Sequence, residues 1–167
     1  MTLATLSLAP LTAATPDAVE ALLDRAFGAD RHGRTAYRLR EGAVAIPALS
    51  FSAFDGDALV GAIQCWPVAL DGEPMVMVGP VAVEPARQNT GVGRAMMWAM
   101  LAAADSGAVP HADALMMVGD PDYYLKFGFD ARDTAGWRLP GPWEPRRLLA
   151  RMTGERARRL SGMLARR

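Results

Sequence analysis

A short segment with the residue types needed to bind an anion lies in the middle of the chain, at Gln88-Asn89-Thr90-Gly91-Val92-Gly93. It follows an apolar run that ends at Val83 and precedes a series of helix-forming residues. A loop entering a helix presents unpaired backbone N–H groups, with the positive end of the helix dipole behind them. Glycines let such a backbone approach an anion closely, so the segment suits a phosphate group. An ordinary turn into a helix is the alternative interpretation.

Two well-known phosphate-binding motifs do not match this glycine segment. A Walker A loop needs Gly-Lys followed by Ser or Thr, whereas Arg94 follows Gly93. The Rossmann fingerprint needs a third glycine three residues further on, where Met96 stands. The segment alone therefore leaves the phosphate-bearing ligand undefined.

Other residues that carry chemistry are few. Cys65 is the only cysteine, so no internal disulfide can form, and we interpret it as a buried strand thiol rather than a nucleophile. His32 and His111 are the only histidines and lie far apart in the sequence. A zinc site and a histidine-based triad are therefore poorly supported, and we expect no metal.

The net charge is zero but is distributed unevenly. Residues 144–167 contain eight arginines and two glutamates, a local charge of +6, so the rest of the chain carries −6. Such asymmetry is compatible with a nucleic acid or another anionic partner. We favour a solvated helical face that pairs with the acidic body, and we therefore do not expect nucleic-acid binding.

The compartment is inferred from what the sequence does not contain. No uninterrupted apolar run approaches the roughly 20 residues that span a bilayer, so we expect no membrane association. The first sixteen residues, MTLATLSLAPLTAATP, lack the positive region of a secretory signal. We expect a cytoplasmic protein.

Helices and a three-stranded meander precede the glycine segment. Thr15-Pro16-Asp17 has the cap and N1 residues that start a helix, and Gly28 ends it. A second short helix is predicted over Arg34–Gly42. Alternating apolar residues and the turns at Asp55-Gly56-Asp57 and Asp71–Pro74 predict an antiparallel meander. Its three strands are Leu49–Phe54, Ala58–Trp66 and Met75–Val83.

After the glycine segment the pattern becomes helix, strand and helix. The predicted elements are a helix at Gly91–Ala104, a buried strand at Ala114–Val118, a short helix at Asp122–Lys126 ended by Gly128, a return to the sheet from Phe129, a loop after Trp137, and a helix at Glu155–Leu164. The resulting fold class is mixed α/β, with a parallel crossover through the central helix. We expect one domain, residues 1–167, in which 140–167 form a Pro/Gly-rich and then Arg-rich C-terminal extension.

The glycine segment, with its preceding strand and following helix, resembles the Q/R-x-x-G-x-G/A motif of the GNAT N-acetyltransferase superfamily. The resemblance implies a central mixed, mostly antiparallel sheet flanked by helices. It also implies that the loop binds the pyrophosphate of coenzyme A and that the preceding strand pairs with the pantetheine arm. The irregular Gly79-Pro80 fits the splayed strand of that family. The implied cofactor-binding residues are Val81, Ala82, Val83, Gln88, Asn89, Thr90, Gly91, Val92, Gly93 and Arg94.

A second signature follows at Asp120–Phe129. It resembles the Y-x-x-x-G-F segment of GNAT proteins, with Tyr124, Gly128 and Phe129 in register. The resemblance implies that Tyr124 is the general acid that protonates the leaving thiolate. Tyr123 is interpreted as a core residue. Together the two signatures resemble small bacterial predicted acetyltransferases.

The sequence departs from the family at the position of the general base. Many members carry a glutamate on the strand before the loop, and counting back from Gln88 places that position at or near Met77, which cannot accept a proton. Glu84 is interpreted as a loop carboxylate. Asp120, another acidic side chain, a water chain or solvent remain alternatives for the base. Candidate walls of the acceptor site, each interpreted first as packing, are Phe27, Tyr37, Arg38, Trp66 and Trp137.

The implied function is direct transfer of an acetyl group from acetyl-CoA to a primary amine, on a small molecule or a protein. A backbone N–H near Val83 would stabilise the oxyanion. The alternative is a non-catalytic acyl-CoA-binding or sensor domain whose Arg-rich tail contacts a partner or nucleic acid. The acceptor amine, the acyl-chain preference and the formation of a homodimer are left open.

Overall fold

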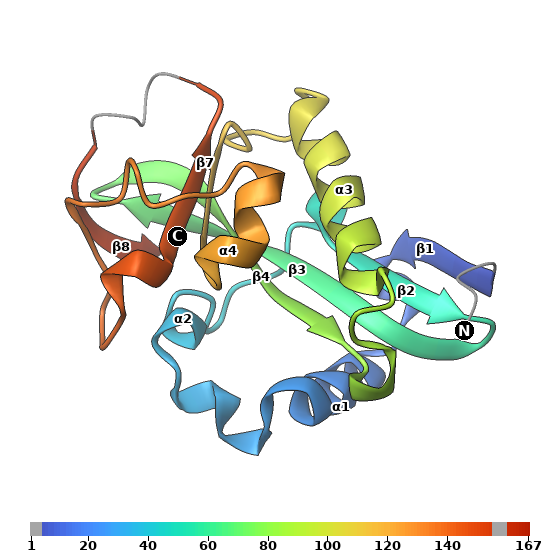
Figure 1. The fold of residues 1–167 in the computed structure, drawn as a ribbon. Helices are drawn as coiled ribbons and strands as arrows, with labels where there is room; N and C mark the ends of the chain where they lie inside the picture. The colour runs from blue at the N-terminus through green and yellow to red at the C-terminus, as the bar shows by residue number, and fades with distance from the viewer. Residues whose placement is uncertain (1–4, 155–159) are drawn as a thin grey trace.

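The computed structural model describes residues 5–154 and 160–167 as one mixed, mostly antiparallel sheet with helices on both faces (Figure 1). The order along the main path is β1 (Leu6–Pro10), β2 (Phe51–Asp55), β3 (Ala58–Leu70), β4 (Glu73–Val83), β5 (Ala114–Val118) and β7 (Leu148–Met152). The short strand β6 (Trp137–Arg138) pairs with β8 (Gly162–Arg166), which also pairs with the far end of β3. Along the main path only β4 and β5 run parallel, joined by a helical crossover, as predicted.

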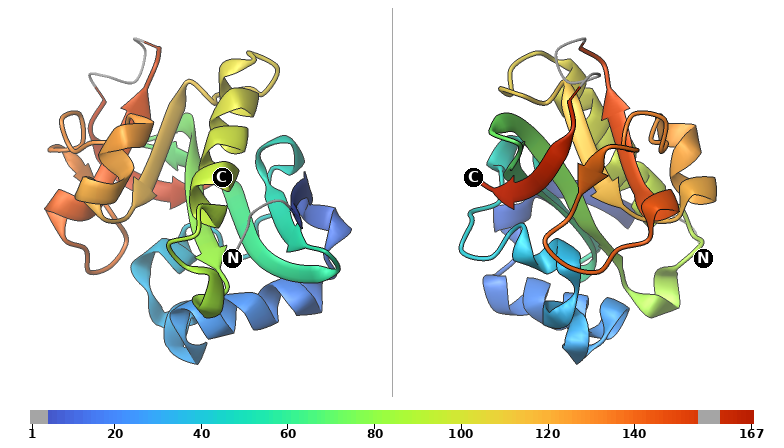
Figure 2. Two further views of the ribbon diagram at one scale, coloured as in Figure 1. Left: turned by 45° about the vertical axis from the view of Figure 1, so that its right-hand side comes forward. Right: turned by 90° about the vertical axis from the view of Figure 1, so that its left-hand side faces the viewer.

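Two longer helices, α1 (Pro16–Phe27) and α3 (Val92–Asp105), cover opposite faces of the meander (Figures 1 and 2). The Thr15 hydroxyl accepts a hydrogen bond from the Ala18 N–H at 3.2 Å, so α1 starts at the predicted cap. Its buried residues pack on Ala62 and Ala82. The preceding residue of β3, Gly61, faces α3, and a Cβ there would lie 2.8 Å from Val92. Because successive residues of β3 face opposite sides of the sheet, one set of them packs against α1 and the other against α3.

Two shorter helices, α2 (Thr35–Arg38) and α4 (Pro121–Tyr124), lie in the segments predicted to hold short helices. Helix α2 is shorter than the predicted Arg34–Gly42, since turns occupy its second half. Helix α4 begins one residue earlier than predicted and continues as a 3-10 turn at Leu125–Phe127. No helix in the described ranges has both the length and the apolar character needed to cross a membrane.

The edges of the sheet differ from the prediction. Strand β1 was not predicted because LSLAP is mostly exposed and ends in a proline. Phe129 does not begin a strand: one isolated bridge joins Asp130 to Ala150. Within the predicted helix Glu155–Leu164, residues 155–159 lie outside the described part, and Gly162–Leu164 belong to β8. Leu164 is fully buried opposite Leu70, so sheet pairing replaces helical periodicity.

Candidate active site

The site begins where β4 leaves β5. The parallel pairing covers Val76 with Leu115 and Met77 with Met116, and no further register pair follows. Just beyond, the single β3 residue Gln64 faces both Gly79 and Pro80 on β4, so one extra residue forms the irregularity expected at Gly79-Pro80.

Gly79 has a positive φ of 117°, which favours glycine. Its carbonyl accepts a hydrogen bond from Trp66 Nε1 at 2.8 Å, which holds the irregular backbone in place. The irregularity therefore turns β4 away from its parallel neighbour at a fixed point.

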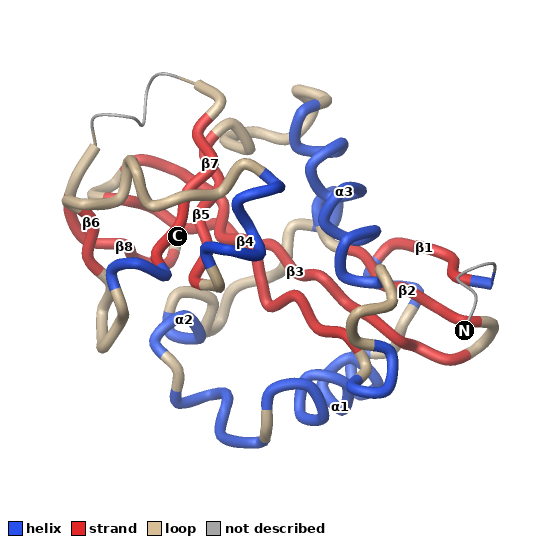
Figure 3. The backbone as a smooth tube through the Cα atoms, viewed as in Figure 1, coloured by secondary structure: helices blue, strands red, loops and turns tan. Residues whose placement is uncertain are grey.

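A cavity of about 1230 Å³ occupies this opening. Its walls come from the α1–α2 segment, the second half of β4, the glycine segment, the end of β5 with α4, and residues 139–147. Figure 3 shows the loop from β4 to α3 at the end of β4, and the segment carrying α2 on the other side of that strand, nearer its middle. Segments far apart in the sequence thus share one cavity.

The glycine segment forms one end of this cavity. Gly91 caps α3 in the left-handed region, with φ of 95°, and Asn89 has φ of 63°. The Ala95 N–H donates to the Gly91 carbonyl at 3.0 Å, which makes the N–H groups of residues 92–94 the free donors of the first turn. Because α3 has 14 residues, its dipole adds positive potential there. The geometry suits an anion.

Most of the predicted cofactor-binding residues meet at this end. The cavity is lined by Val81, Val83, Gln88, Asn89, Thr90, Gly91, Gly93 and Arg94. Two do not line it: Ala82 is buried under α1, and Val92 is buried in the core beneath α3. The alternating direction of side chains along β4 accounts for Ala82.

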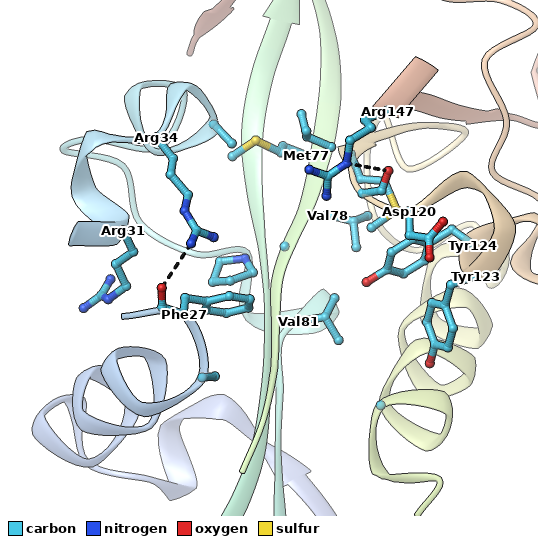
Figure 4. A pocket seen from close by; sticks show the side chains of 18 of the residues that line it. Phe27, Arg31, Arg34, Met77, Val78, Val81, Asp120, Tyr123, Tyr124 and Arg147 are labelled. Carbon is cyan, nitrogen blue, oxygen red and sulfur yellow. Dashed lines mark hydrogen bonds between the residues drawn. The ribbon is translucent and has the colours of Figure 1, made fainter. Parts of the chain in front are cut away.

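Tyr124 enters the cavity from α4 (Figure 4). The Asp120 carboxylate accepts a hydrogen bond from the Asp122 N–H at 3.0 Å and caps the helix. The Tyr124 ring packs against Gly119, where a Cβ would lie 2.6 Å from the ring. Tyr123 contacts it edge-on, with ring centroids 4.8 Å apart.

The Tyr124 phenol is protonated at neutral pH. Burial raises its pKa to about 12, and neighbouring Tyr123 and Asp120 add to this, while Arg147 opposes it. A protonated phenol inside a cavity can donate a proton to a basic leaving group.

The cavity contains no glutamate at the position expected for a base. Met77 lines it, is 3% exposed and cannot accept a proton. Glu84 is outside the lining and forms an ion pair with Arg25 at 2.8 Å, in agreement with its interpretation as a loop carboxylate. Among the acidic alternatives for the base, Asp120 and Glu144 line the cavity.

Cys65 is fully buried, and burial raises the pKa of its thiol, so its interpretation as a buried strand thiol is confirmed. Among the described residues, no group of three or more His, Cys, Asp or Glu side chains is placed to hold a metal ion.

The candidate acceptor walls divide into two groups. Phe27 and Tyr37 line the cavity. Arg38, Trp66 and Trp137 do not: Arg38 donates to the Pro140 carbonyl, Trp66 holds Gly79, and Trp137 is core.

Sequence reasoning missed four arginines of the lining, which are Arg31, Arg34, Arg40 and Arg147. Arg147 belongs to the Arg-rich segment interpreted as a solvated face. Only the pairing of β7 with β5 brings it to the cavity.

The sequence of this chain matches the model of a known protein family. The model of the acetyltransferase (GNAT) family matches residues 17–129, from α1 to the end of the Tyr124 segment. The chain belongs to the GNAT family. The matched range contains the glycine segment, the opening between β4 and β5, and Tyr124. No curated protein matches the chain in sequence.

Solved GNAT structures share its fold. The GNAT N-acetyltransferase YhbS of Escherichia coli, solved in complex with CoA, superposes with a TM-score of 0.72 at 23% sequence identity. The alignment covers 98% of this chain and 90% of the YhbS chain. A GNAT acetyltransferase from Brucella melitensis in complex with acetyl-CoA gives 0.56 at 24% identity, with 87% and 94% covered. Naa50 of Arabidopsis thaliana, bound to a bisubstrate analogue, gives 0.56 at 17% identity, with 87% and 96% covered.

Proposed function

We propose that this GNAT domain transfers an acetyl group from acetyl-CoA to a primary amine, on a small molecule or a protein, with Tyr124 as general acid. The observation that carries the proposal is that the glycine-capped start of α3 and the Tyr124 phenol line the same cavity where β4 leaves β5. The CoA and acetyl-CoA bound in the E. coli and B. melitensis structures support the choice of donor. We further propose that residues 1–167 act as one acyltransferase domain, with 140–167 as a C-terminal extension of it.

In the proposed complex, the pyrophosphate of coenzyme A accepts hydrogen bonds from the backbone of the glycine segment. The second half of β4, no longer paired with β5, has main-chain groups available to the pantetheine arm. The proposed cofactor-binding set is the ten residues predicted from the sequence. For Ala82 and Val92, whose side chains are buried in the core, only main-chain atoms contribute.

The proposed reaction is a direct displacement. The neutral amine nitrogen attacks the thioester carbonyl, a C–N bond forms, and a backbone N–H near Val83 stabilises the oxyanion. The C–S bond then breaks, the amine loses one proton to water, and the thiolate receives the Tyr124 proton. Water returns a proton to the phenol, so the products are the acetamide and free coenzyme A. Asp120, another acidic side chain, a water chain and solvent are the candidates for accepting the amine proton.

The second candidate function is a non-catalytic acyl-CoA-binding or sensor domain, with the Arg-rich end contacting a partner or nucleic acid. The observation that favours it is Met77, because this lining side chain cannot act as a base. Both functions require the glycine segment to bind coenzyme A, but only the enzyme requires Tyr124 as a general acid.

Release of free thiol from acetyl-CoA, measured with a panel of primary amines, separates the two functions. For the enzyme, Tyr124→Phe should lower kcat by about 10²- to 10⁴-fold, the usual range for a lost general acid, and leave the Kd for coenzyme A unchanged. Full activity in this variant would remove Tyr124 from the mechanism. Coenzyme A binding without thiol release from any amine would favour the binding domain.

A further inference from the structure

The end of the cavity away from the glycine segment is built from two distant segments, residues 27–40 and 139–147. They are tied together directly. The Thr35 hydroxyl donates to the Pro142 carbonyl, and Arg38 Nη1 donates to the Pro140 carbonyl at 2.7 Å. Besides Arg31, this wall carries three arginines, which are Arg34, Arg40 and Arg147.

Arg40 lies beside the opening between β4 and β5. Its guanidinium stacks on the rings of Tyr37 and Trp66, at 4.5 and 4.9 Å from their centroids. It donates to Gln64 Oε1 at 3.3 Å, and Gln64 is the β3 residue opposite the irregularity in β4. Arg40 is therefore anchored beside the point where β4 leaves β5. Burial lowers the pKa of its guanidinium.

Arg34 and Arg147 approach from opposite sides of β4 (Figure 4). Arg34 Nη2 donates to the Phe27 carbonyl at 3.0 Å, and Arg147 Nε donates to the Gly119 carbonyl at 3.4 Å. Both bonds are to neutral groups, so they orient the guanidinium groups without neutralising them.

None of these three arginines forms an ion pair with a carboxylate among the described residues. The contrast is Arg31, also in the lining, which pairs with Glu20 and with Asp24. Arg40 and Arg147 are partly buried, whereas Arg34 is exposed. A partly buried guanidinium without an ion-pair partner is costly unless a ligand supplies the negative charge.

The two acidic residues of the lining form no ion pair with these arginines. They are Asp120, which caps α4, and Glu144, which pairs with the exposed Arg146 at 3.6 Å. The glycine end has cations of its own in Arg94 and Lys126, the latter 4.2 Å from the centroid of the Tyr123 ring. The phosphates of coenzyme A therefore do not require the arginine end.

We propose that the acceptor is a small amine that also carries an anionic oxygen group, a carboxylate or a phosphate, which binds Arg40 together with Arg34 and Arg147. This inference rests on the proposed acetyl transfer and specifies its substrate class. Guanidinium groups bind both anions through paired N–H donors. The same positive charge disfavours acceptors with a second ammonium group, such as polyamines.

Matched pairs of amines test the proposal through thiol release from acetyl-CoA. The pairs are L-phenylalanine with phenethylamine, L-lysine with cadaverine, and O-phosphoethanolamine with ethanolamine. We expect kcat/KM to be at least about 10-fold higher for the anionic member of one pair, as for other charge-assisted contacts in a partly buried site. The first two pairs report on carboxylate and the third on phosphate. Equal use of both members in all pairs would overturn the proposal.

Substitution of single arginines tests which of them bind the anionic group of the acceptor. Arg40→Gln and Arg147→Gln should each raise KM for the preferred anionic amine by about 10-fold or more, and leave KM for its neutral counterpart and for acetyl-CoA unchanged. Arg138→Gln removes an exposed arginine outside the cavity and is the matched control. Arg40→Lys retains the charge if glutamine disturbs the packing of Tyr37 and Trp66. Retention of the preference in both the Arg40 and the Arg147 variants would refute the assignment.

A binding measurement tests the anion site independently of the proposed transfer reaction. Calorimetry with coenzyme A present compares N-acetyl-L-phenylalanine with its amide, and phosphate with chloride. Binding of the anion that Arg40→Gln abolishes, without thiol release from any amine, would retain the anion site and reject the proposed reaction. Thiol release with no preference for an anion in either assay would retain the reaction and reject the anion site.

Discussion

The two ends of the cavity are built from different parts of the polypeptide. The glycine end presents main-chain N–H groups from one continuous segment at the start of α3. The arginine end presents guanidinium groups from segments about a hundred residues apart, held together by Thr35 and Arg38. A main-chain site is sensitive to an added Cβ and indifferent to most side chains. A side-chain site can change its ligand through single substitutions.

The largest effect that would sharpen this contrast is expected at Gly91. Gly91→Val forces a branched side chain into the left-handed region, with φ of 95°, and blocks approach of the backbone to a phosphate. We expect the Kd for coenzyme A to rise by about 100-fold, equivalent to about 2.7 kcal/mol. Titration calorimetry measures it.

The reciprocal control is Arg40→Gln, which should leave this Kd unchanged. If Gly91→Val bound coenzyme A normally, the main-chain description of the glycine end would be wrong.

A second substitution tests how the acid is positioned between the two ends. Gly119→Ala places a Cβ 2.6 Å from the Tyr124 ring, so the ring must move. We expect kcat to fall by about 10-fold and the free energy of unfolding to fall by about 1–3 kcal/mol, as in other overpacked sites. Urea denaturation and initial rates measure the two effects.

Gly33→Ala is the matched control for stability, because its Cβ would meet nothing within 4 Å. An unchanged kcat in Gly119→Ala would show that the position of the Tyr124 ring does not limit the reaction.

The pH dependence gives a smaller effect. Since the pKa of Tyr124 is raised to about 12 from its usual 10, the phenol stays protonated between these values. The rate at saturating amine should therefore show no descending limb below about pH 11, whereas an unshifted phenol would lose about three quarters of its protonated form by pH 10.5.

The sign for stability follows from the same shift. The folded state holds the phenolic proton of Tyr124 more tightly than the unfolded state does. The resulting contribution to the free energy of unfolding is complete below pH 10 and is lost as the pH rises towards 12. A rate that halves near pH 10 would contradict the buried, protonated acid.

The smallest effect is expected at Glu84. This carboxylate pairs with Arg25 at 2.8 Å, and both side chains are partly exposed, 25% and 48%. Glu84→Gln should change stability by less than about 1 kcal/mol and kcat by less than about twofold. A large loss of kcat, with an altered ascending limb of the pH profile, would instead make Glu84 the missing base.

Local signals were sufficient for the helix after Thr15, the meander and the crossover, because caps, turns and alternation act within a few residues. The pairing of β7 with β5 and of β8 with β3 could not be predicted, since Leu148–Met152 has no clear alternation. The same division holds for the site. The glycine segment is continuous in sequence, whereas the convergence of Arg40 and Arg147 depends on long-range pairing.

The bonds from Thr35 to Pro142 and from Arg38 to Pro140 have a consequence for synthesis. Chains emerge from the ribosome N-terminus first, and contacts between distant residues form late because they close long loops. The strands and the helix around the glycine segment are complete by residue 118, so they leave the ribosome before the wall at 139–147. A nascent chain can therefore assemble the glycine end of its cavity while the arginine end is still missing.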